Sequence, residues 1–491
     1  MSLLEPLRFA QLIGQLGRLP MKSAATIERL QQQRLKKLLN YASQHSSFYR
    51  KRLNGVLSSS GPIDLALIPP TTKKEMQEQF DDVVTDPRLH RSDIEQFVQD
   101  ESNLGKWYLG EYAASHTSGS QGSPLLIVQN RHAFRVVLAT MSARCRPAAP
   151  PSVAEGIRKL IRPSRVAVIS FKRGFYPSGV TIELMQEYFG PLAKIQRYSS
   201  FQPDLLDQLN KYQPQVISGY ASVLEGLAIQ HDRIRLNSLE HISNSSEQLT
   251  DRARKRIENA FGVPVFDHYG AGECLQLADG CRHCGGLHIN ADWAILESVD
   301  DDYRPVPAGE TGSRILVTNL ANFVQPFIRY EIPDRVALHP PGDNCPNRLP
   351  RIKRIEGRSA ELFWVDDNGQ NRFVSGVLFH SAIDALQIVH EWKAIQRERN
   401  LIELHLQFLP EKQVALPEIE NRLTQKLHRD GLPRSVQIRL IESQELTADP
   451  ATGKMQRMIT TLLPVTPRAR KPFLHHCSSG KLSYRVLEIK F

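Results

Sequence analysis

Apolar and polar positions recur with helical or strand periods along most of the chain. From Ile27 to about Leu53, leucines recur at helical spacing among Lys and Arg residues, which predicts one helix. Val166–Ser170 and Val216–Gly219 are short apolar runs bounded by turn residues, which predict buried strands. Helical patterns occupy residues 204–209, 222–231 and 252–261. Strands that alternate with helices predict an α/β domain with a largely parallel sheet.

The pattern changes after about Arg335, where prolines gather between positions 340 and 350. Two apolar runs then flank Asp366–Gly369, a turn sequence that predicts a β-hairpin. Ile402–Leu406 alternates strictly between apolar and polar residues, as a half-buried strand does. A helix is predicted at residues 417–428 and a strand at residues 436–440. Together these elements predict a small α+β unit of roughly a hundred residues.

The bulk composition excludes several classes of protein. A chain of 491 residues with 41% hydrophobic and 23% charged residues matches a globular protein with a large core. It contains no run of about 18 apolar residues, so no membrane span is predicted. The start, Met1–Glu5, lacks the basic and apolar segments of a signal peptide, and the expected compartment is the cytoplasm.

The net charge of +10 is concentrated toward the C-terminal end, where residues after Thr466 include six basic residues and one acidic residue. A basic tail fits nucleic acid or anionic lipid, and a solvated chain end is the simpler explanation. The chain has no alternation of aromatic and basic residues of the kind that binds nucleic acid, so we expect no such partner.

One stretch, His116–Pro124, alternates hydroxyl side chains with glycines and precedes the strand-like run Leu125–Val128. Glycine lets the backbone approach a ligand closely, and hydroxyl and free N–H groups bind an anion without a fixed charge. Such a loop suits the phosphates of a nucleotide, although a plain surface loop has the same composition. It is not a Walker loop, because no Gly-Lys-Ser/Thr ends it and no helix follows.

A second glycine-containing motif, Asp267–Glu273, follows the strand-like run Val263–Phe266. Ligands of α/β proteins bind at the carboxyl ends of strands, so this position favours a ligand site. Tyr269 is suited to stack on a purine, and Glu273 is suited to hold a magnesium ion.

Three further motifs follow in order, namely Arg329–Asp334, Ile355–Arg358 and Thr452–Arg457. In this order and spacing, the motifs resemble those of the adenylate-forming superfamily of acyl-CoA synthetases and ligases. The chain most resembles the phenylacetate–CoA ligase branch and its capsular-polysaccharide relatives, whose N-terminal helix is similar to Arg34–Tyr49. The resemblance covers about residues 27–463.

This resemblance implies an α/β fold with a large adenylation domain at residues 1–357, in which β-sheets are flanked by helices. A small, mobile α+β lid domain at residues 358–466 and the basic tail at residues 467–491 would follow. The implied enzyme activates a carboxylic acid with ATP to an acyl-AMP, releases pyrophosphate and passes the acyl group to CoA. The expected ligands are therefore ATP or AMP, Mg²⁺ and CoA, and the expected substrate is an aryl or other apolar acid.

The resemblance also implies roles for single residues. Lys454 would be the catalytic lysine that bridges the acyl carboxylate and the α-phosphate, while Glu273 with Mg²⁺ and Ser118 would act on the phosphates. Asp334 would bind the ribose, and Arg358 would belong to the hinge. The implied phosphate loop comprises Thr117, Ser118, Gly119, Ser120 and Gly122, the adenine side Ser246, Glu247, Asp267, His268, Tyr269 and Gly270, and the acyl pocket Phe171, Tyr220 and Ala271. The two aromatic residues of that pocket fit a core position equally well.

Several positions depart from the family pattern. A lysine usually stands next to the proline of the phosphate loop, and here Ser123 and Leu125 occupy those places. Ala360 stands where the hinge motif has an aspartate, with Glu361 next to it. Glu331 is expected to add a negative charge near the ribose. These changes preserve the expectation of adenylation and bear mainly on the transfer step.

Three of the six cysteines fall between positions 274 and 284, which favours a metal or redox site. Cys281 and Cys284 form a Cys-x-x-Cys knuckle with His288 four residues on. In the branch that the chain resembles, Cys281, His288 and Cys345 match cysteine and histidine positions, which implies a structural zinc on Cys281, Cys284, His288 and Cys345. The alternatives are free thiols with a structural His288, or Cys274 or His283 as the fourth ligand.

Two other functions stay open from the sequence. The first is adenylation followed by transfer to an amine, a hydroxyl or a carrier-protein thiol. The second is a non-catalytic binding protein on a degenerate ligase fold, against which the retained Glu273, Asp334, Arg358 and Lys454 argue. A homodimer also stays an open alternative.

Overall fold

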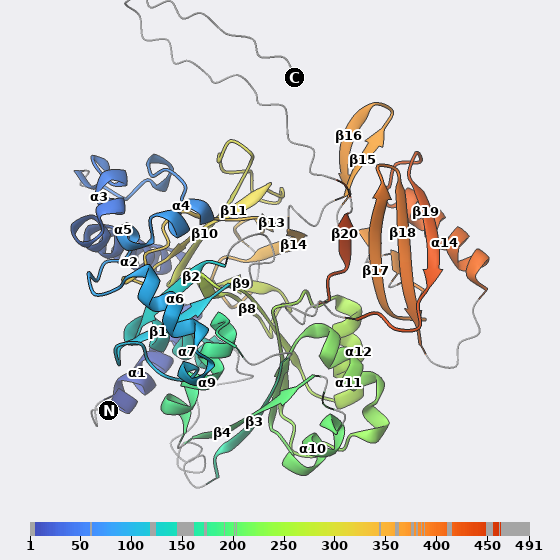
Figure 1. The fold of residues 1–491 in the computed structure, drawn as a ribbon, viewed down its shortest axis with the longest axis horizontal. Coiled ribbons are helices and arrows are strands. Elements are labelled where there is room, and N and C mark those ends of the chain that lie inside the picture. Colours follow the sequence, from blue (N-terminus) through green and yellow to red (C-terminus); the bar gives the residue numbers. More distant parts are fainter. Residues whose placement is uncertain are drawn as a thin grey trace, which may run out of the picture.

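The computed structural model describes most of the chain. The described residues are 5–58, 61–117, 124–144, 162–170, 174–190, 192–200, 202, 204–342, 345–358, 363–374, 378–379, 382–383, 385–386, 388–409, 415–447, 455–460 and 462. Figure 1 shows a large N-terminal body, residues 5–358, and beside it a smaller C-terminal unit, residues 363–462. The domain boundary predicted at residue 357 lies near the end of the last strand of the body and stays a prediction.

The largest sheet contains seven strands in the order β4-β3-β5-β6-β7-β8-β9. Strands β4 to β7 are parallel, and β8 and β9 continue the sheet antiparallel at one edge. The strands are β3 (Ser164–Ser170), β4 (Ala193–Ser199), β5 (Val216–Gly219), β6 (His241–Ser245), β7 (Val265–Ala271), β8 (Cys274–Gly280) and β9 (Leu287–Ile289). The predicted α/β class with a largely parallel sheet is confirmed.

Helices cover both faces of this sheet (Figure 1). On one face lie α10 (Leu205–Tyr212), α11 (Ala221–Ile229) and α12 (Asp251–Phe261), and on the other lies α9 (Pro177–Phe189). Local signals set their ends. Thr250 accepts a hydrogen bond from the Ala253 N–H at the start of α12, and Gly262 ends that helix with a φ of 66°. The three helices predicted between residues 204 and 261 are therefore present.

A second core of the body includes helix α2 (Ala24–His45), whose Leu35, Leu38 and Leu39 are fully buried. These leucines share a core with the three-stranded sheet β10-β11-β12. Strands β1 and β2 form one antiparallel pair, and β13 and β14 form another. The remaining elements are α1 (Glu5–Arg18), α3 (Ser47–Arg52), α4 (Lys73–Glu78), α5 (Phe80–Val83), α6 (Arg91–Gln99), α7 (Arg131–Arg144), β1 (Tyr112–His116), β2 (Leu126–Asn130), β10 (Ala294–Val299), β11 (Arg314–Asn319), β12 (Tyr330–Ile332), β13 (Asp334–Leu338) and β14 (Ile352–Arg358), together with short 3-10 helices.

The prediction of one helix from Ile27 to Leu53 is wrong, because α2 and α3 are separate helices. Ser46 lies between them in an extended conformation, with φ −116° and ψ 123°. Its hydroxyl accepts a hydrogen bond from the Tyr49 N–H and donates to the Asp82 carbonyl, 2.8 Å away. A serine that caps a new helix interrupts the chain even where the apolar spacing continues.

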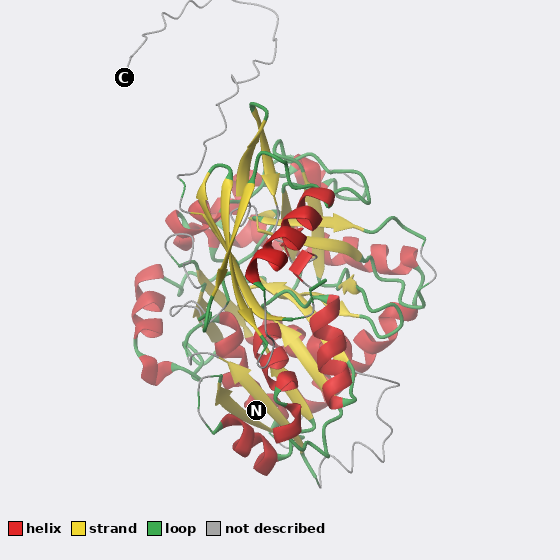
Figure 2. Ribbon diagram, turned by 90° about the vertical axis from the view of Figure 1, so that its right-hand side faces the viewer, coloured by secondary structure: helices red, strands yellow, loops and turns green. Residues whose placement is uncertain are grey.

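The C-terminal unit contains a hairpin, a four-stranded sheet and one long helix that lies against the sheet (Figure 2). The predicted hairpin is present, and it turns at Asn368 and Gly369, whose φ values are 56° and 82°. Asp366 and Asp367 of the predicted turn sequence belong to strand β15. Trp392, Leu404 and Leu423 belong to a core made by residues of this unit. The elements are β15 (Phe363–Asp367), β16 (Gln370–Val374), β17 (Val389–Glu398), β18 (Leu401–Phe408), α14 (Leu416–Arg429), β19 (Gln437–Glu442) and β20 (Met458–Thr460), and the sheet order is β19-β18-β17-β20.

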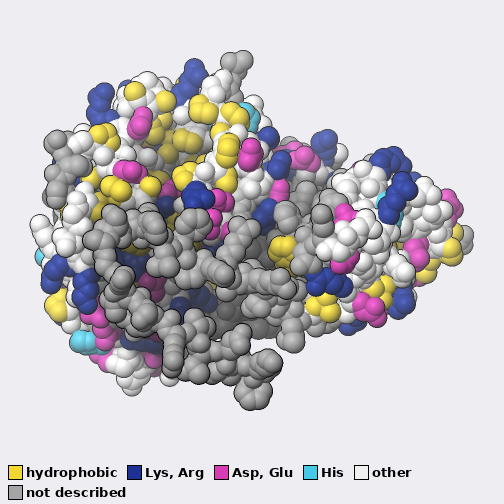
Figure 3. Space-filling view, turned by 90° about the horizontal axis from the view of Figure 1, so that it is seen from above, with side chains coloured by type: hydrophobic (Ala, Val, Ile, Leu, Met, Phe, Trp, Pro, Cys, Tyr) yellow, Lys and Arg dark blue, Asp and Glu magenta, His cyan; other side chains and the backbone are white. Residues whose placement is uncertain are grey.

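Seen from above, the C-terminal unit forms a lobe on which basic and acidic side chains are mixed (Figure 3). Among the residues that the structure describes, no helix is long and apolar enough to cross a membrane.

Candidate functional site

The ends of the parallel strands β6 and β7 hold the predicted adenine-side residues together. The Nδ2 atom of the buried Asn244 donates to Asp267 Oδ1 at 2.6 Å and to the Glu247 carbonyl at 2.9 Å. Burial raises the pKa of Asp267, and the hydrogen bond from Asn244 opposes that rise. Ser246 follows β6 with a φ of 69°, a left-handed conformation that is uncommon for a residue with a side chain and occurs at ligand sites.

The motif Asp267–Glu273 lies largely within β7 rather than in a loop after it. Strand β7 continues through Ala271 and folds back into β8, so that Gly272 and Glu273 form the tip of a hairpin. A Cβ at Gly270 would lie 2.1 Å from the Leu275 carbonyl oxygen, and the strand register shifts there. Glycine is therefore required at position 270 by the hairpin itself, before any ligand is considered.

The tip of this hairpin lies against the base of the predicted phosphate loop. A Cβ at Gly272 would meet Thr117 Cγ2 at 3.4 Å and Ile127 Cδ1 at 3.0 Å. Thr117 closes the loop, because its N–H donates to the Leu125 carbonyl and its Oγ1 accepts from the Leu125 N–H, both at 2.9 Å. Leu125, which stands where the family has a lysine, is fully buried in the core. Ser118, Gly119, Ser120, Gly122 and Ser123 lie outside the described residues.

The predicted ribose residue is next to the predicted purine residue. The Tyr269 hydroxyl donates to Asp334 Oδ2 at 2.7 Å, and Asp334 is 8% exposed. Asp334 begins β13 and pairs through its backbone with Arg358 at the end of β14. The two motifs that the resemblance implies for the ribose and the hinge are thus brought into register on neighbouring strands.

Glu273, the predicted magnesium ligand, is 8% exposed at the hairpin tip. Asn319 Nδ2 donates to its backbone carbonyl at 2.8 Å. Burial, the charge of Glu273 and a hydrogen bond to Glu273 all raise the pKa of Tyr330, so the neutral phenol remains a donor to this carboxylate. The sequence reasoning missed Tyr330, although it lies inside the Arg329–Asp334 motif, because no local pattern shows that β12 approaches the hairpin tip.

His268 supports the hairpin from inside. Its Nδ1 lies 2.6 Å from Asp279 Oδ1, and Asn290 Nδ2 donates to Asp279 Oδ2 at 2.7 Å. All three side chains are largely buried. Asp279 and Asn290 were not predicted, since only the antiparallel register of β7 and β8 places Asp279 opposite His268. His268 is therefore held by Asp279 of the neighbouring strand, and its predicted place on the adenine side stays a prediction.

Glu247 connects the body to the C-terminal unit. Its Oε2 accepts from the Ser222 N–H at 2.9 Å, and its Oε1 accepts from the Met455 N–H at 3.2 Å. Lys454, the predicted catalytic lysine, lies outside the described residues and directly precedes Met455 in the sequence. Near it, Arg457 makes two hydrogen bonds to Glu391, at 2.9 Å and 2.8 Å.

Glu331, which is expected to add a negative charge near the ribose, has two partners among the neighbouring side chains. Glu331 Oε1 pairs with Arg314 Nη1 at 3.0 Å, and Glu331 Oε2 accepts a hydrogen bond from the Tyr303 hydroxyl at 2.5 Å. The charge of Arg314 therefore balances that of Glu331, and the effect of Glu331 on a bound ribose stays a prediction. Ala360 and Glu361 of the hinge motif lie outside the described residues.

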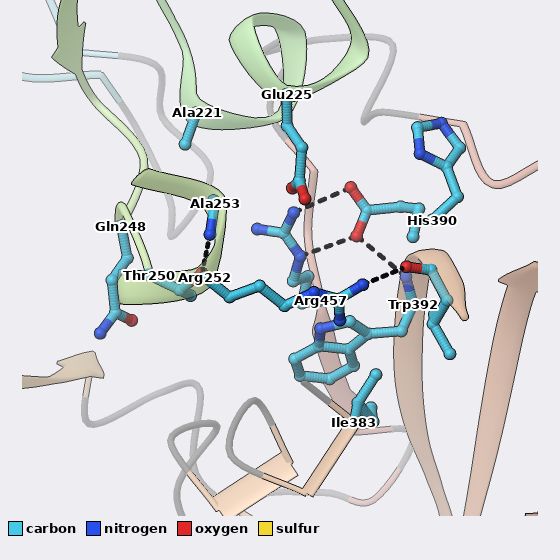
Figure 4. A pocket seen from close by; sticks show the side chains of 12 residues that line it. Ala221, Glu225, Gln248, Thr250, Arg252, Ala253, Ile383, His390, Trp392 and Arg457 are labelled. Carbon is cyan, nitrogen blue, oxygen red and sulfur yellow. Dashed lines mark hydrogen bonds and ion pairs between the residues drawn. The ribbon is translucent and has the colours of Figure 1, made fainter. Parts of the chain in front are cut away.

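The residues predicted for the acyl pocket are placed only in part. Phe171 lies outside the described residues, while Tyr220 precedes α11 and Ala271 precedes the hairpin tip. Strands β3 and β5 are parallel neighbours, so Ser170 and Gly219 end adjacent strands. A separate pocket between the body and the C-terminal unit is lined in part by Glu225 and Ala253 (Figure 4).

Cys281, Cys284, His288 and Cys345 form one group, and their ligand atoms all lie within 4.8 Å of one another. The sulfur atoms of Cys281 and Cys345 are 3.7 Å apart, and the Cys284 sulfur is 3.4 Å from His288 Nε2. His288 Nδ1 lies 2.7 Å from the Leu349 carbonyl, which requires the proton on Nδ1 and leaves the Nε2 lone pair facing the sulfur atoms.

The two alternative ligands for this group lie elsewhere. Cys274 is buried in the main core, where burial and then the charge of Glu273 raise the pKa of its thiol to about 12. His283 is exposed on the knuckle. Neither belongs to the group of four. A backbone turn shapes the knuckle, since the Gly285 N–H donates to the Cys281 carbonyl at 2.7 Å and Gly285 has a φ of 68°.

Sequence comparison finds relatives over about two thirds of the chain. Protein CapK of Staphylococcus aureus is 24% identical over 360 residues, which cover 69% of this chain and 70% of that protein. Phenylacetate-coenzyme A ligase of Thermus thermophilus is 25% identical over 350 residues, which cover 68% and 71%. The Escherichia coli enzyme of the same name is 25% identical over 383 residues, which cover 72% and 76%. No family model matches the chain.

Solved structures share the fold over almost the whole chain. A 2-hydroxyisobutyryl-CoA ligase in its postadenylation state matches with a TM-score of 0.68 and 19% identity, covering 89% of this chain and 90% of that one. The same ligase in its thioesterification state matches with a TM-score of 0.55. An anthranilate CoA ligase matches with a TM-score of 0.51 and 17% identity, covering 70% and 65%. The chain is therefore a homologue of phenylacetate-coenzyme A ligase and CapK with the fold of the adenylate-forming acyl-CoA ligases.

Proposed function

We propose that this protein is an AMP-forming carboxylate–CoA ligase, which converts a carboxylic acid and ATP to an acyl-AMP and pyrophosphate and then forms an acyl-CoA. The observation that carries the proposal is the convergence around the β7–β8 hairpin. Thr117 meets the hairpin tip beside Glu273, and Tyr269 contacts Asp334. Relatives in sequence that are named phenylacetate-coenzyme A ligases, and structural neighbours that are CoA ligases, support the same reaction.

In the first half-reaction an acid oxygen attacks the α-phosphorus of ATP and the bond to pyrophosphate breaks. The protein contributes positioning and neutralisation of charge. Thr117 and the N–H and hydroxyl groups of the loop that it closes, Ser118 among them, would hold the phosphates. Asp334 would accept hydrogen bonds from the ribose hydroxyls, and Lys454 would lie between the acyl carboxylate and the α-phosphate. Such an array stabilises charge as it develops in the transition state.

A magnesium ion fits the surroundings of Glu273. Its carboxylate is largely withdrawn from water, and the neutral phenol of Tyr330 donates to it. A hard oxygen ligand of this kind is what Mg²⁺ prefers, with phosphate oxygens completing the site. When bound, the ion would offset negative charge on the phosphates.

The acid is proposed to be aryl or otherwise apolar. The relatives and neighbours include ligases of phenylacetate, anthranilate and 2-hydroxyisobutyrate by name.

The TM-score is higher with the postadenylation state than with the thioesterification state of the 2-hydroxyisobutyryl-CoA ligase, which supports an arrangement suited to the first half-reaction.

The cytoplasm remains the proposed location, since ATP and CoA are available there. A homodimer remains a proposal that sedimentation would test.

A panel of carboxylic acids, screened for acid-dependent ATP–pyrophosphate exchange, tests the proposal. We expect at least one apolar acid to support exchange, and addition of CoA to give its thioester. Exchange without thioester formation would indicate that the acyl group is transferred to an amine, a hydroxyl or a carrier-protein thiol instead of CoA. If no acid in a broad panel supports exchange, the chain is not an adenylating enzyme and the reading as a binding protein gains support.

Asp334→Ala is expected to raise the KM for ATP about tenfold while changing kcat less, because a ribose contact exists both before and during the reaction. Steady-state kinetics of the exchange reaction give both constants. Tyr269→Phe is the matched variant, since it removes only the hydroxyl that donates to Asp334 and keeps the ring, and we expect a smaller change. An unchanged KM for ATP in Asp334→Ala would show that the ribose is bound elsewhere.

We also propose that Cys281, Cys284, His288 and Cys345 bind one structural zinc ion. Three sulfur atoms and one imidazole nitrogen that already face one another form the donor set that zinc takes in closed sites. The hydrogen bond from His288 Nδ1 to the Leu349 carbonyl is the outer contact that such a histidine needs. Four protein ligands leave no open position, so the ion would stabilise the fold and take no part in the reaction.

A further inference from the structure

Two side chains of the body, Glu247 in the segment between β6 and α12 and Arg252 in the first turn of α12, contact the backbone of the C-terminal unit. The Glu247 carboxylate accepts from the Met455 N–H at 3.2 Å, and Arg252 Nη2 donates to the Val389 carbonyl at 3.0 Å. Figure 4 shows Arg252 extending from α12 across the pocket between the two parts of the molecule. Glu247 accepts from a backbone N–H, and Arg252 donates to a backbone carbonyl. Both bonds are charge-assisted, because one partner in each is an ionised side chain.

The two contact points lie next to each other in the C-terminal unit. Val389 begins β17, and Met455 precedes β20 by three residues. These strands are parallel neighbours, with Ala394 opposite Met458 and an Ala394 N–H that donates to the Arg457 carbonyl at 2.7 Å. Glu247 and Arg252 therefore hold the entry points of two paired strands, and the segment between Lys454 and β20 has little freedom once both bonds form.

Charge around these contacts is balanced across the interface. Arg457 is paired with Glu391 of its own unit, and although burial opposes its charge, Glu391 and then Glu247 raise its pKa. Glu225 of α11 pairs with Arg256 of α12 and also interacts with Glu391 and Arg457. Both ion pairs lie within one part of the molecule, whereas across the interface Arg457 attracts Glu247 and Glu225, and Glu391 repels Glu225. A rotation would separate Arg457 from the two glutamates that attract it, which favours the present arrangement.

We propose that Glu247 and Arg252 are positioning residues, which clamp the C-terminal unit so that Lys454 is presented to the site during adenylation. Glu247 then acts on the lysine segment, because one carboxylate oxygen accepts from a backbone N–H of the body and the other accepts from a backbone N–H of the C-terminal unit. The role of Lys454 in this inference rests on the proposed function. The clamp itself rests only on the contacts that Glu247 and Arg252 make with the C-terminal unit.

The test uses the full-length protein and the variants Glu247→Ala, Arg252→Ala and the double variant, with Arg252→Lys as the conservative replacement. Gln248→Ala is the matched control, because Gln248 lies between the two and donates to the Ile355 carbonyl of the body instead. Hydrogen exchange of a peptide covering residues 455–460 is measured without substrates. We expect exchange to quicken about fivefold to tenfold in each alanine variant, to recover in part in Arg252→Lys and to stay unchanged in Gln248→Ala.

The kinetic arm measures the two half-reactions separately, using ATP–pyrophosphate exchange and thioester formation from supplied acyl adenylate. We expect the kcat of exchange to fall about fivefold to tenfold, with less than about a twofold change in the KM for ATP and a smaller loss in thioester formation. A raised KM with an unchanged kcat would make Glu247 a nucleotide contact and overturn the proposal, and so would unchanged hydrogen exchange. If the unmodified protein shows no adenylation, the proposed function fails, and the hydrogen-exchange result still decides whether the clamp exists.

Discussion

Lys454→Ala is expected to lower the rate of acid-dependent ATP–pyrophosphate exchange by a factor on the order of 10²–10³. In the proposed role of Lys454, the lost charge would act where the α-phosphate and the acyl carboxylate develop charge in the transition state. Its surroundings support this role. The Met455 N–H donates to Glu247 of the body, while Arg457 pairs with Glu391 of its own unit, so the first of these contacts joins the residues after Lys454 to the body.

Lys426→Ala is the matched control for that variant. Lys426 lies in α14 of the same unit and pairs with Asp430 at 2.8 Å on the surface, where such a pair contributes little to stability. We expect its exchange rate and thermal midpoint to equal those of the unmodified protein. Thermal unfolding of Lys454→Ala should also be unchanged. Retained exchange in Lys454→Ala with the true acid would exclude Lys454 from catalysis.

Cys345→Ser is expected to remove most of the zinc from protein purified without chelator, which should otherwise contain about one ion per chain. Cys345 is the distant ligand, because the other three lie on one knuckle while Cys345 comes from the segment after β13. Without Cys345 the metal site is no longer closed. Metal binding then no longer stabilises the folded knuckle and the segment after β13 together. We expect a thermal midpoint lower by several degrees, with activity lost only as a consequence.

Elemental analysis and calorimetry of three variants separate this site from its alternatives. His283→Ala should retain the zinc, because His283 is exposed on the knuckle and lies outside the group of four. Cys274→Ser should retain it as well, although removing a buried thiol disturbs the core. Zinc retained in Cys345→Ser and lost in Cys274→Ser would show that the wrong fourth ligand was proposed, and fully active protein without zinc would refute the site.

The elements with strong local signals were predictable from the sequence. The strands β3 and β5, the helix α12 with Thr250 and Gly262 at its ends, and the hairpin at Asn368–Gly369 each carry their own pattern or turn residue. The break at Ser46 was not predictable from apolar spacing, because its cause is a hydroxyl that caps a second helix and bonds the distant Asp82 carbonyl.

For the candidate site, the residues could be predicted from the sequence, whereas their contacts could not. The sequence by itself determined which residue types are present in which order, and these include Glu273, Asp334 and the four Cys and His ligands. The pairing of strands decided what those residues contact. The β7–β8 register places His268 against Asp279, β12 brings Tyr330 to Glu273, and Glu331 is turned to Arg314. Contacts between residues far apart in sequence arise from packing that no local pattern encodes, and only the tertiary structure could therefore place Glu247 and Arg252 on the C-terminal unit.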